Sequence, residues 1–111
     1  PEAADLASGL SVRISWMATT ATTGNVRWRV ALERGNTDLD ADSFDTAAEG
    51  NGTANGTSGI PSTTSISLTT LDSVAVGEPY RIRISRVGSD ATNDTMTGDA
   101  ELIAVEVRSA A

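Results

Sequence analysis

Alternating apolar and polar positions dominate residues 10–33. If this stretch folds back on itself about Thr22, every pair of positions on one face is apolar, whereas the other face is mostly polar. The apolar face collects Val12, Ile14, Trp16, Ala18, Val26, Trp28, Val30 and Leu32. Such alternation is typical of antiparallel strands with one buried face. We therefore predict a first β-hairpin in which Trp16 lies opposite Trp28.

Three later segments alternate in the same way and predict further strands at 63–70, 79–87 and 101–108. In the first of them Thr64, Ile66 and Leu68 share one face. The last two fit a second hairpin with apolar and opposite-charge pairs, which favour a register. The predicted pairs are Tyr80 with Val107, Ile82 with Val105, Ile84 with Ile103, Arg86 with Glu101 and Arg81 with Glu106.

The connection over residues 35–62 is rich in Gly, Asp and Asn-Gly steps, which are typical of irregular structure. We expect it to lie over one end of the sandwich, with one helical turn at 43–49 capped by Asp42. Leu71, Val74 and Val76 are predicted to close the core edge. The pattern as a whole predicts an all-β, single-domain antiparallel β-sandwich of jelly-roll type, in which residues 1–9 form an N-terminal arm and 10–111 the sandwich. Strands beyond the five assigned would come from the arm, the long connection and residues 71–76.

Composition narrows the range of functions. A chain of 111 residues suits one domain. It contains neither Cys nor His, which argues against Ser-His-Asp and Cys-His catalysis and against ordinary zinc sites. The net charge of -7 opposes binding to nucleic acid or to anionic membranes, and no apolar run is long enough to span a bilayer. We expect no enzyme activity, no nucleic-acid partner and no membrane partner.

One acidic run resembles a calcium-binding loop. Asp38, Asp40 and Asp42 alternate, and Glu49 stands at the twelfth position counted from Asp38. Ser43 occupies the sixth position, where such a loop needs Gly, and no helical pattern flanks the run. A solvated acidic loop is therefore the favoured interpretation, and calcium is the one cofactor that the sequence suggests; no other cofactor is expected.

Arginine supplies all the basic residues, and several arginines fall on the outward faces of the predicted strands. This set is Arg13, Arg27, Arg29, Arg81 and Arg83. Arg forms bidentate bonds with carboxylates, so the set predicts a subunit contact or an anionic-ligand surface, whose partner would be an acidic loop such as residues 90–99 of a neighbouring copy. The alternative, which we favour, is a solvated sheet face paired with Glu33, Glu101 and Glu106.

Four segments together resemble a family of phage and prophage virion proteins: GNVRWRVALE, LDADSFDT, LTTLDSVAVGEPYRIRISR and DTMTGDAELIAVEVR. The resemblance covers residues 12–108, and its specific parts are Trp28, residues 39–44, Gly77 before Arg81, Arg83 and Arg86, and residues 96–102. It implies a β-sandwich or jelly-roll domain that decorates heads or forms parts of tail or head fibres, usually as a trimer. It implies no catalytic residue.

The sequence thus predicts a non-enzymatic virion structural protein at the virion surface or outside the cell, either a bacteriophage capsid decoration or cement protein or a fibre domain. It would act by forming homo-oligomers, with a trimer suspected, and by docking onto capsid or other virion proteins. A carbohydrate-binding host-attachment module is one alternative, although only Phe44 among the aromatic residues is not assigned to the core. An extracellular filament subunit is the other.

Overall fold

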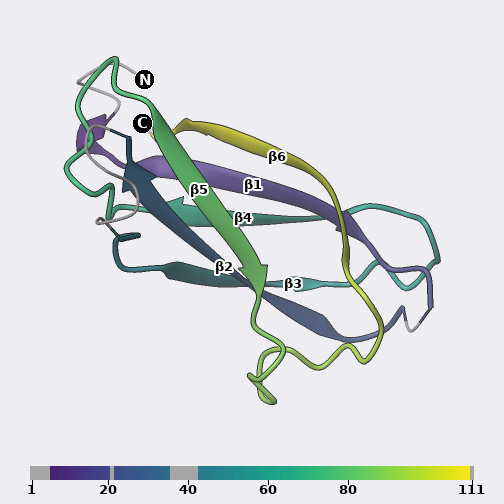
Figure 1. The fold of residues 1–111 in the computed structure, drawn as a ribbon. Coiled ribbons are helices and arrows are strands. Elements are labelled where there is room, and N and C mark those ends of the chain that lie inside the picture. The colour runs from purple at the N-terminus through teal and green to yellow at the C-terminus, as the bar shows by residue number, and fades with distance from the viewer. Residues whose placement is uncertain (1–5, 21, 36–42, 111) are drawn as a thin grey trace.

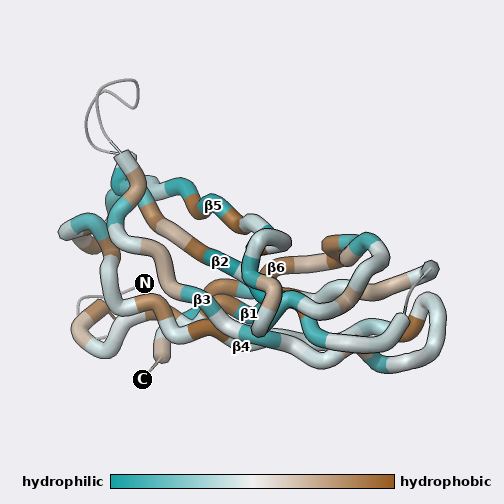
Figure 2. The backbone as a smooth tube through the Cα atoms, turned by 90° about the horizontal axis from the view of Figure 1, so that it is seen from below, coloured by the Kyte–Doolittle hydropathy of each residue, from teal (hydrophilic) through white to brown (hydrophobic). Residues whose placement is uncertain are grey.

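A computed structural model of the chain describes residues 6–20, 22–35 and 43–110. These residues form two three-stranded antiparallel sheets that pack face to face (Figures 1 and 2). The strands are β1 (Leu10–Met17), β2 (Asn25–Arg34), β3 (Ala48–Thr53), β4 (Ser62–Leu68), β5 (Tyr80–Arg86) and β6 (Glu101–Ser109). One sheet has the order β4-β1-β6 and the other the order β3-β2-β5. The prediction of an antiparallel all-β sandwich is confirmed at this level.

The core lies between the central strands β1 and β2. All eight residues predicted to share the apolar face of residues 10–33 are buried, and Thr64, Ile66 and Leu68 of β4 are buried with them. The rings of Trp16 and Trp28 meet with centroids 6.2 Å apart, and Trp16 Nε1 donates a hydrogen bond of 3.0 Å to Thr64 Oγ1. Burial of large apolar side chains on both sheets is the main source of stability in such a sandwich.

The predicted hairpin pairing of residues 10–33 is wrong. β1 and β2 belong to different sheets: β1 pairs with β4 and β6, whereas β2 pairs with β3 and β5. Trp16 and Trp28 do meet, but across the core and not as neighbours in one sheet. Alternation determines which face of a strand is buried, and two apolar faces can be buried equally well by stacking one sheet on the other.

The second predicted hairpin is also wrong, because β5 and β6 lie in different sheets. The predicted pairs of Tyr80 with Val107 and of Ile84 with Ile103 therefore do not form. Arg81 instead pairs with Glu33, and Arg86 pairs with Asp94. Each arginine therefore has a carboxylate partner, but not the partner that the register predicted.

The predicted helical turn at 43–49 is replaced by irregular chain followed by β3. Two of the three inward positions of β3, Gly50 and Gly52, are glycines because core side chains fill the space beside them. A Cβ at Gly50 would lie 2.9 Å from Ile66 Cγ1, and one at Gly52 would lie 2.0 Å from Thr64 Oγ1. β3 is thus one of the further strands expected from the long connection.

Two segments with apolar residues that we expected to be buried, 71–76 and β6, are exposed in part. Leu71 is buried and Val74 packs against the core, but Val76 is 52% exposed. On β6, Ile103 and Val105 are exposed as well. Figure 1 shows the cause at β6: β5 slants steeply across the view while β6 runs nearly along β1, so that the opposite sheet does not cover this edge. In the N-terminal arm, Leu6 packs against the core and residues 1–5 lie outside the described residues.

Candidate functional site

The outer face of the β3-β2-β5 sheet holds most of the predicted arginine surface. Arg27 and Arg29 stand on β2, and Arg81 and Arg83 stand on β5. Arg13 lies elsewhere, on the outer face of the other sheet, opposite Ser65 on β4 and Glu106 on β6. The structure therefore brings four of the five arginines onto one sheet face, which we call the arginine face, and separates Arg13 from them.

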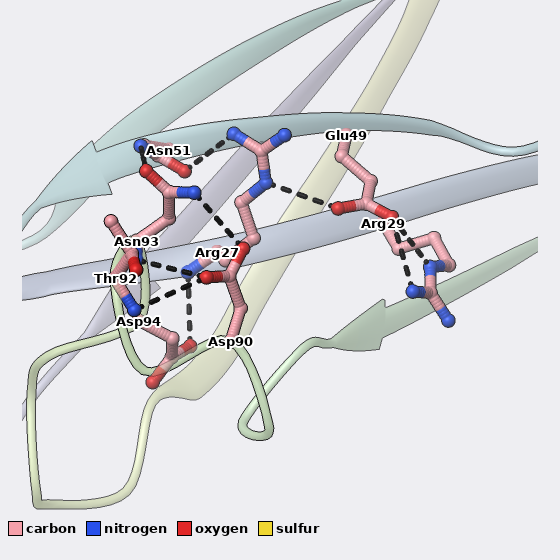
Figure 3. A network of polar contacts seen from close by, with 8 residues as sticks. All are labelled: Arg27, Arg29, Glu49, Asn51, Asp90, Thr92, Asn93 and Asp94. Atoms are coloured by element: carbon pink, nitrogen blue, oxygen red, sulfur yellow. Dashed lines mark hydrogen bonds and ion pairs between the residues drawn. The ribbon is translucent and has the colours of Figure 1, made fainter.

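Arg27 and Arg29 share one carboxylate on the neighbouring strand β3 (Figure 3). Arg27 Nε donates to Glu49 Oε1 over 3.1 Å, and Arg29 Nε donates to Glu49 Oε2 over 3.1 Å. Arg27 Nη1 also donates to Asn51 Oδ1 at 2.7 Å. These hydrogen bonds hold the pKa of Glu49 below its usual value.

The acidic connection between β5 and β6 packs back onto its own chain. Asn51 Nδ2 donates to Asn93 Oδ1, and Asn93 donates in turn to Asp90 (Figure 3). The side-chain hydrogen bond from Asn93, together with the backbone N–H groups of Asn93 and Thr92, lowers the pKa of Asp90. The connection that we expected to contact the arginines of a neighbouring copy therefore contacts the arginine face of its own sheet.

Asp94 and Arg86 form the most buried ion pair of this connection. Arg86 donates from Nε and Nη2 to both Asp94 oxygens, at 2.9 Å to Oδ2 and 2.8 Å to Oδ1. Arg86 Nη1 also donates to the Gly98 carbonyl, and the Arg27 backbone N–H donates to Asp94 Oδ2. Burial alone would raise the pKa of Asp94, but these hydrogen bonds outweigh it and the pKa is lowered. The hydrogen bonds of Asp94 raise the pKa of Arg86.

Phe44 lies beneath two arginines of β5. The guanidinium carbons of Arg81 and Arg83 stand 5.1 and 4.6 Å from its ring centroid. Arg81 Nε also donates to Glu33 Oε1, and Glu33 is fully buried. Trp16 and Trp28 are buried and Tyr80 is partly buried, so no aromatic ring of the described residues stands open as a platform for a sugar.

The predicted calcium ligands Asp38, Asp40 and Asp42 lie outside the described residues. The fourth member, Glu49, is described, and both of its oxygens accept hydrogen bonds from arginines. Within the described ranges, no cluster of three or more potential metal-ligating side chains occurs.

The exposed strand β6 is the feature that sequence reasoning missed. It stands at the end of its sheet and pairs only with β1 among the described strands. Leu102, Ile103 and Val105 are 51%, 49% and 38% exposed. Val105 lies opposite the fully buried Ile14 in the register, so it belongs to the face that elsewhere forms the core. An apolar strand whose outer edge and inner face are both open is typical of an interaction surface.

Comparisons with protein-family models, with curated proteins and with solved structures found no match. Within the described residues, no helix is long and apolar enough to cross a membrane.

Proposed function

We propose that this chain is a non-enzymatic structural protein that acts by associating with copies of itself and with a larger assembly. The observation that carries the proposal is the open β6 edge with its exposed Leu102, Ile103 and Val105. Exposed apolar side chains in a row on an end strand are stabilised when another surface covers them. The arginine face of the β3-β2-β5 sheet, by contrast, already forms ion pairs within the chain.

The assembly that we propose is a bacteriophage virion, in which a jelly-roll-like body serves as a head decoration or cement protein or as a fibre domain. This part depends on the resemblance of residues 12–108 to virion proteins. A rigid sandwich suits such a role, because many weak contacts repeated by symmetry give firm attachment. The location would then be the virion surface, and the partners would be copies of the chain and a capsid or other virion protein.

The arginine face supports a structural role more than a ligand site. Arg27, Arg29 and Arg81 each have a carboxylate partner within the chain, and Arg83 lies over the Phe44 ring. An anionic ligand would therefore have to replace existing ion pairs. This favours the solvated, internally paired face that the sequence analysis preferred.

The test is to find the protein in particles of the phage that encodes it. Quantitative mass spectrometry of purified virions is expected to give a copy number in a whole-number ratio to a capsid or tail protein. Particles that lack the chain entirely would refute the virion role. Retention of the purified chain on a glycan array would favour the carbohydrate-binding alternative, and head-to-tail polymers of the chain alone would favour the filament alternative.

A further inference from the structure

We propose that β6 pairs antiparallel with β6 of a second copy of this chain about a two-fold axis. The sheet order β4-β1-β6 would then continue as β6-β1-β4 of the partner, giving one sheet through both copies. This inference depends on the self-association in the proposed function and specifies the surface that carries it.

The edge of β6 is suited to strand addition. The strand pairs with β1 on one side through every residue but the bulged Ile103, and no described strand lies on the other side. Backbone N–H and C=O groups on such an edge pair readily with another strand. β6 contains no proline, which would block such pairing. A partner strand would also extend the sheet beside the exposed Leu102, Ile103 and Val105.

β6 has one extra residue, Ile103, where the register with β1 shifts between Ser15 and Trp16. Positions in the proposed β6–β6 pair are therefore counted by the β1 residue that each β6 residue faces. With the two-fold axis at Val105, that residue meets the partner's Val105. The bulged pair Leu102 and Ile103 then meets the partner's Val107. Every one of these positions is apolar, so the pairing joins the apolar stripes of both strands.

The charged positions favour this register over the two registers shifted by one residue. With the axis at Val105, Glu101 lies opposite the partner's Arg108, and the symmetry repeats this pair at the other end. Moving the axis to Glu106 would place that residue against the partner's Glu106. Moving it to Ala104 would place Glu106 against the partner's Glu101. Both shifts juxtapose like charges, which destabilise a strand pair. A second copy is therefore the occupant whose charges complement this edge.

Charge exchange tests the register directly. In Glu101→Arg alone or Arg108→Glu alone, both symmetry-related pairs become like-charged, and we expect association to weaken about tenfold or more. An equimolar mixture of the two variants restores both ion pairs in the mixed dimer and is expected to recover wild-type association. Sedimentation analysis across protein concentrations measures this. Both residues are exposed, so both variants are expected to remain folded. A mixture no stronger than the single variants would overturn the register.

A second pair of variants tests the apolar centre. Val105→Asp places two carboxylates at the axis and is expected to give a monomer that remains folded. Val76→Asp removes a similarly exposed valine from the connection between β4 and β5 and is expected to leave association intact. Equal loss in both variants would overturn the proposed interface.

The outcomes separate this inference from the proposed function. A wild-type trimer, or association that is unchanged in all β6 variants, would overturn the β6 contact, while whole-number stoichiometry in virions would still support the structural role. A wild type that is monomeric but present in virions would likewise overturn the β6 contact and still support the structural role. Absence from virions together with dimers that dissociate in the β6 variants would refute only the virion role.

Discussion

Gly52 lies against Thr64 so closely that a Cβ at position 52 would stand 2.0 Å from the Thr64 hydroxyl oxygen. The same Cβ would lie 3.1 Å from the Trp16 ring. Thr64 Oγ1 is the acceptor for the buried Trp16 Nε1. The contact between β3 and β4 therefore depends on a missing side chain, and one added methyl group would disturb a hydrogen bond in the core.

Gly52→Ala is accordingly expected to destabilise the fold by about 1–3 kcal/mol, the range typical of overpacking a core. Gly88→Ala is the matched control, because a Cβ at that position would have no heavy atom within 4 Å. Urea denaturation of both variants measures the difference. Equal stability of the two variants would show that the tight contact at β3 does not exist.

The sequence predicts which face of each strand is buried more reliably than which strands are neighbours. The apolar residues of β1, β2 and β4 lie inside as expected. The predicted pairings of β1 with β2 and of β5 with β6 are wrong, because an apolar face can be buried either by a stacked sheet or by a hairpin partner, and alternation is the same in both cases. Charge pairing did not identify the neighbour of β5, because Arg81 can pair with Glu33 on β2 as well as with Glu106 on β6.

Two features had no readable signal in the sequence. β3 has Ala48 and two glycines at its inward positions, so it lacks the large apolar side chains by which a strand is recognised. The exposure of Leu102, Ile103 and Val105 depends on the direction in which β5 crosses the sandwich, which local patterns do not encode. The arginine face was recognisable from alternation, and Glu33 was among its predicted carboxylate partners, but Glu49 was not.

The ion pair between Arg86 and Asp94 predicts sensitivity to acid. The folded-state pKa of Asp94 is lowered below its unfolded value, so its ionised form stabilises the fold. That contribution is fully present above the unfolded pKa of about 3.9 and is lost as the pH falls through the folded value. Asp94→Asn is expected to cost about 2 kcal/mol at neutral pH, because Arg86 then lacks its carboxylate. Stability measured by urea denaturation below pH 4 is expected to fall less steeply with pH in this variant than in the wild type. Parallel curves would contradict this role of Asp94.

The buried carboxylate of Glu33 predicts different effects for two neighbouring arginines. Arg81 and Arg83 both lie over Phe44, but only Arg81 donates to Glu33. Arg81→Met is expected to cost about 2 kcal/mol, because it leaves a fully buried charge without its partner. Arg83→Met is expected to cost less than about 1 kcal/mol, because among the described residues it removes a cation–π contact and no ion pair. Adding Glu33→Gln to the Arg81 variant is expected to recover part of the loss. Chemical denaturation of the three proteins measures these differences, and equal costs for the two arginines would contradict the assignment.

The acidic run that ends in Glu49 predicts the response to calcium. A calcium ion bound through Glu49 would have to displace the hydrogen bonds from Arg27 and Arg29, which keep this carboxylate paired and its pKa low. We therefore expect calcium to leave the melting temperature of the wild type unchanged, and EDTA to have no effect. Glu49→Gln is expected to weaken the network by less than about 1 kcal/mol, as is typical of exposed ion pairs, with or without calcium. A calcium-dependent rise in melting temperature that EDTA reverses and Glu49→Gln abolishes would instead establish the loop as a calcium site with Glu49 as a ligand.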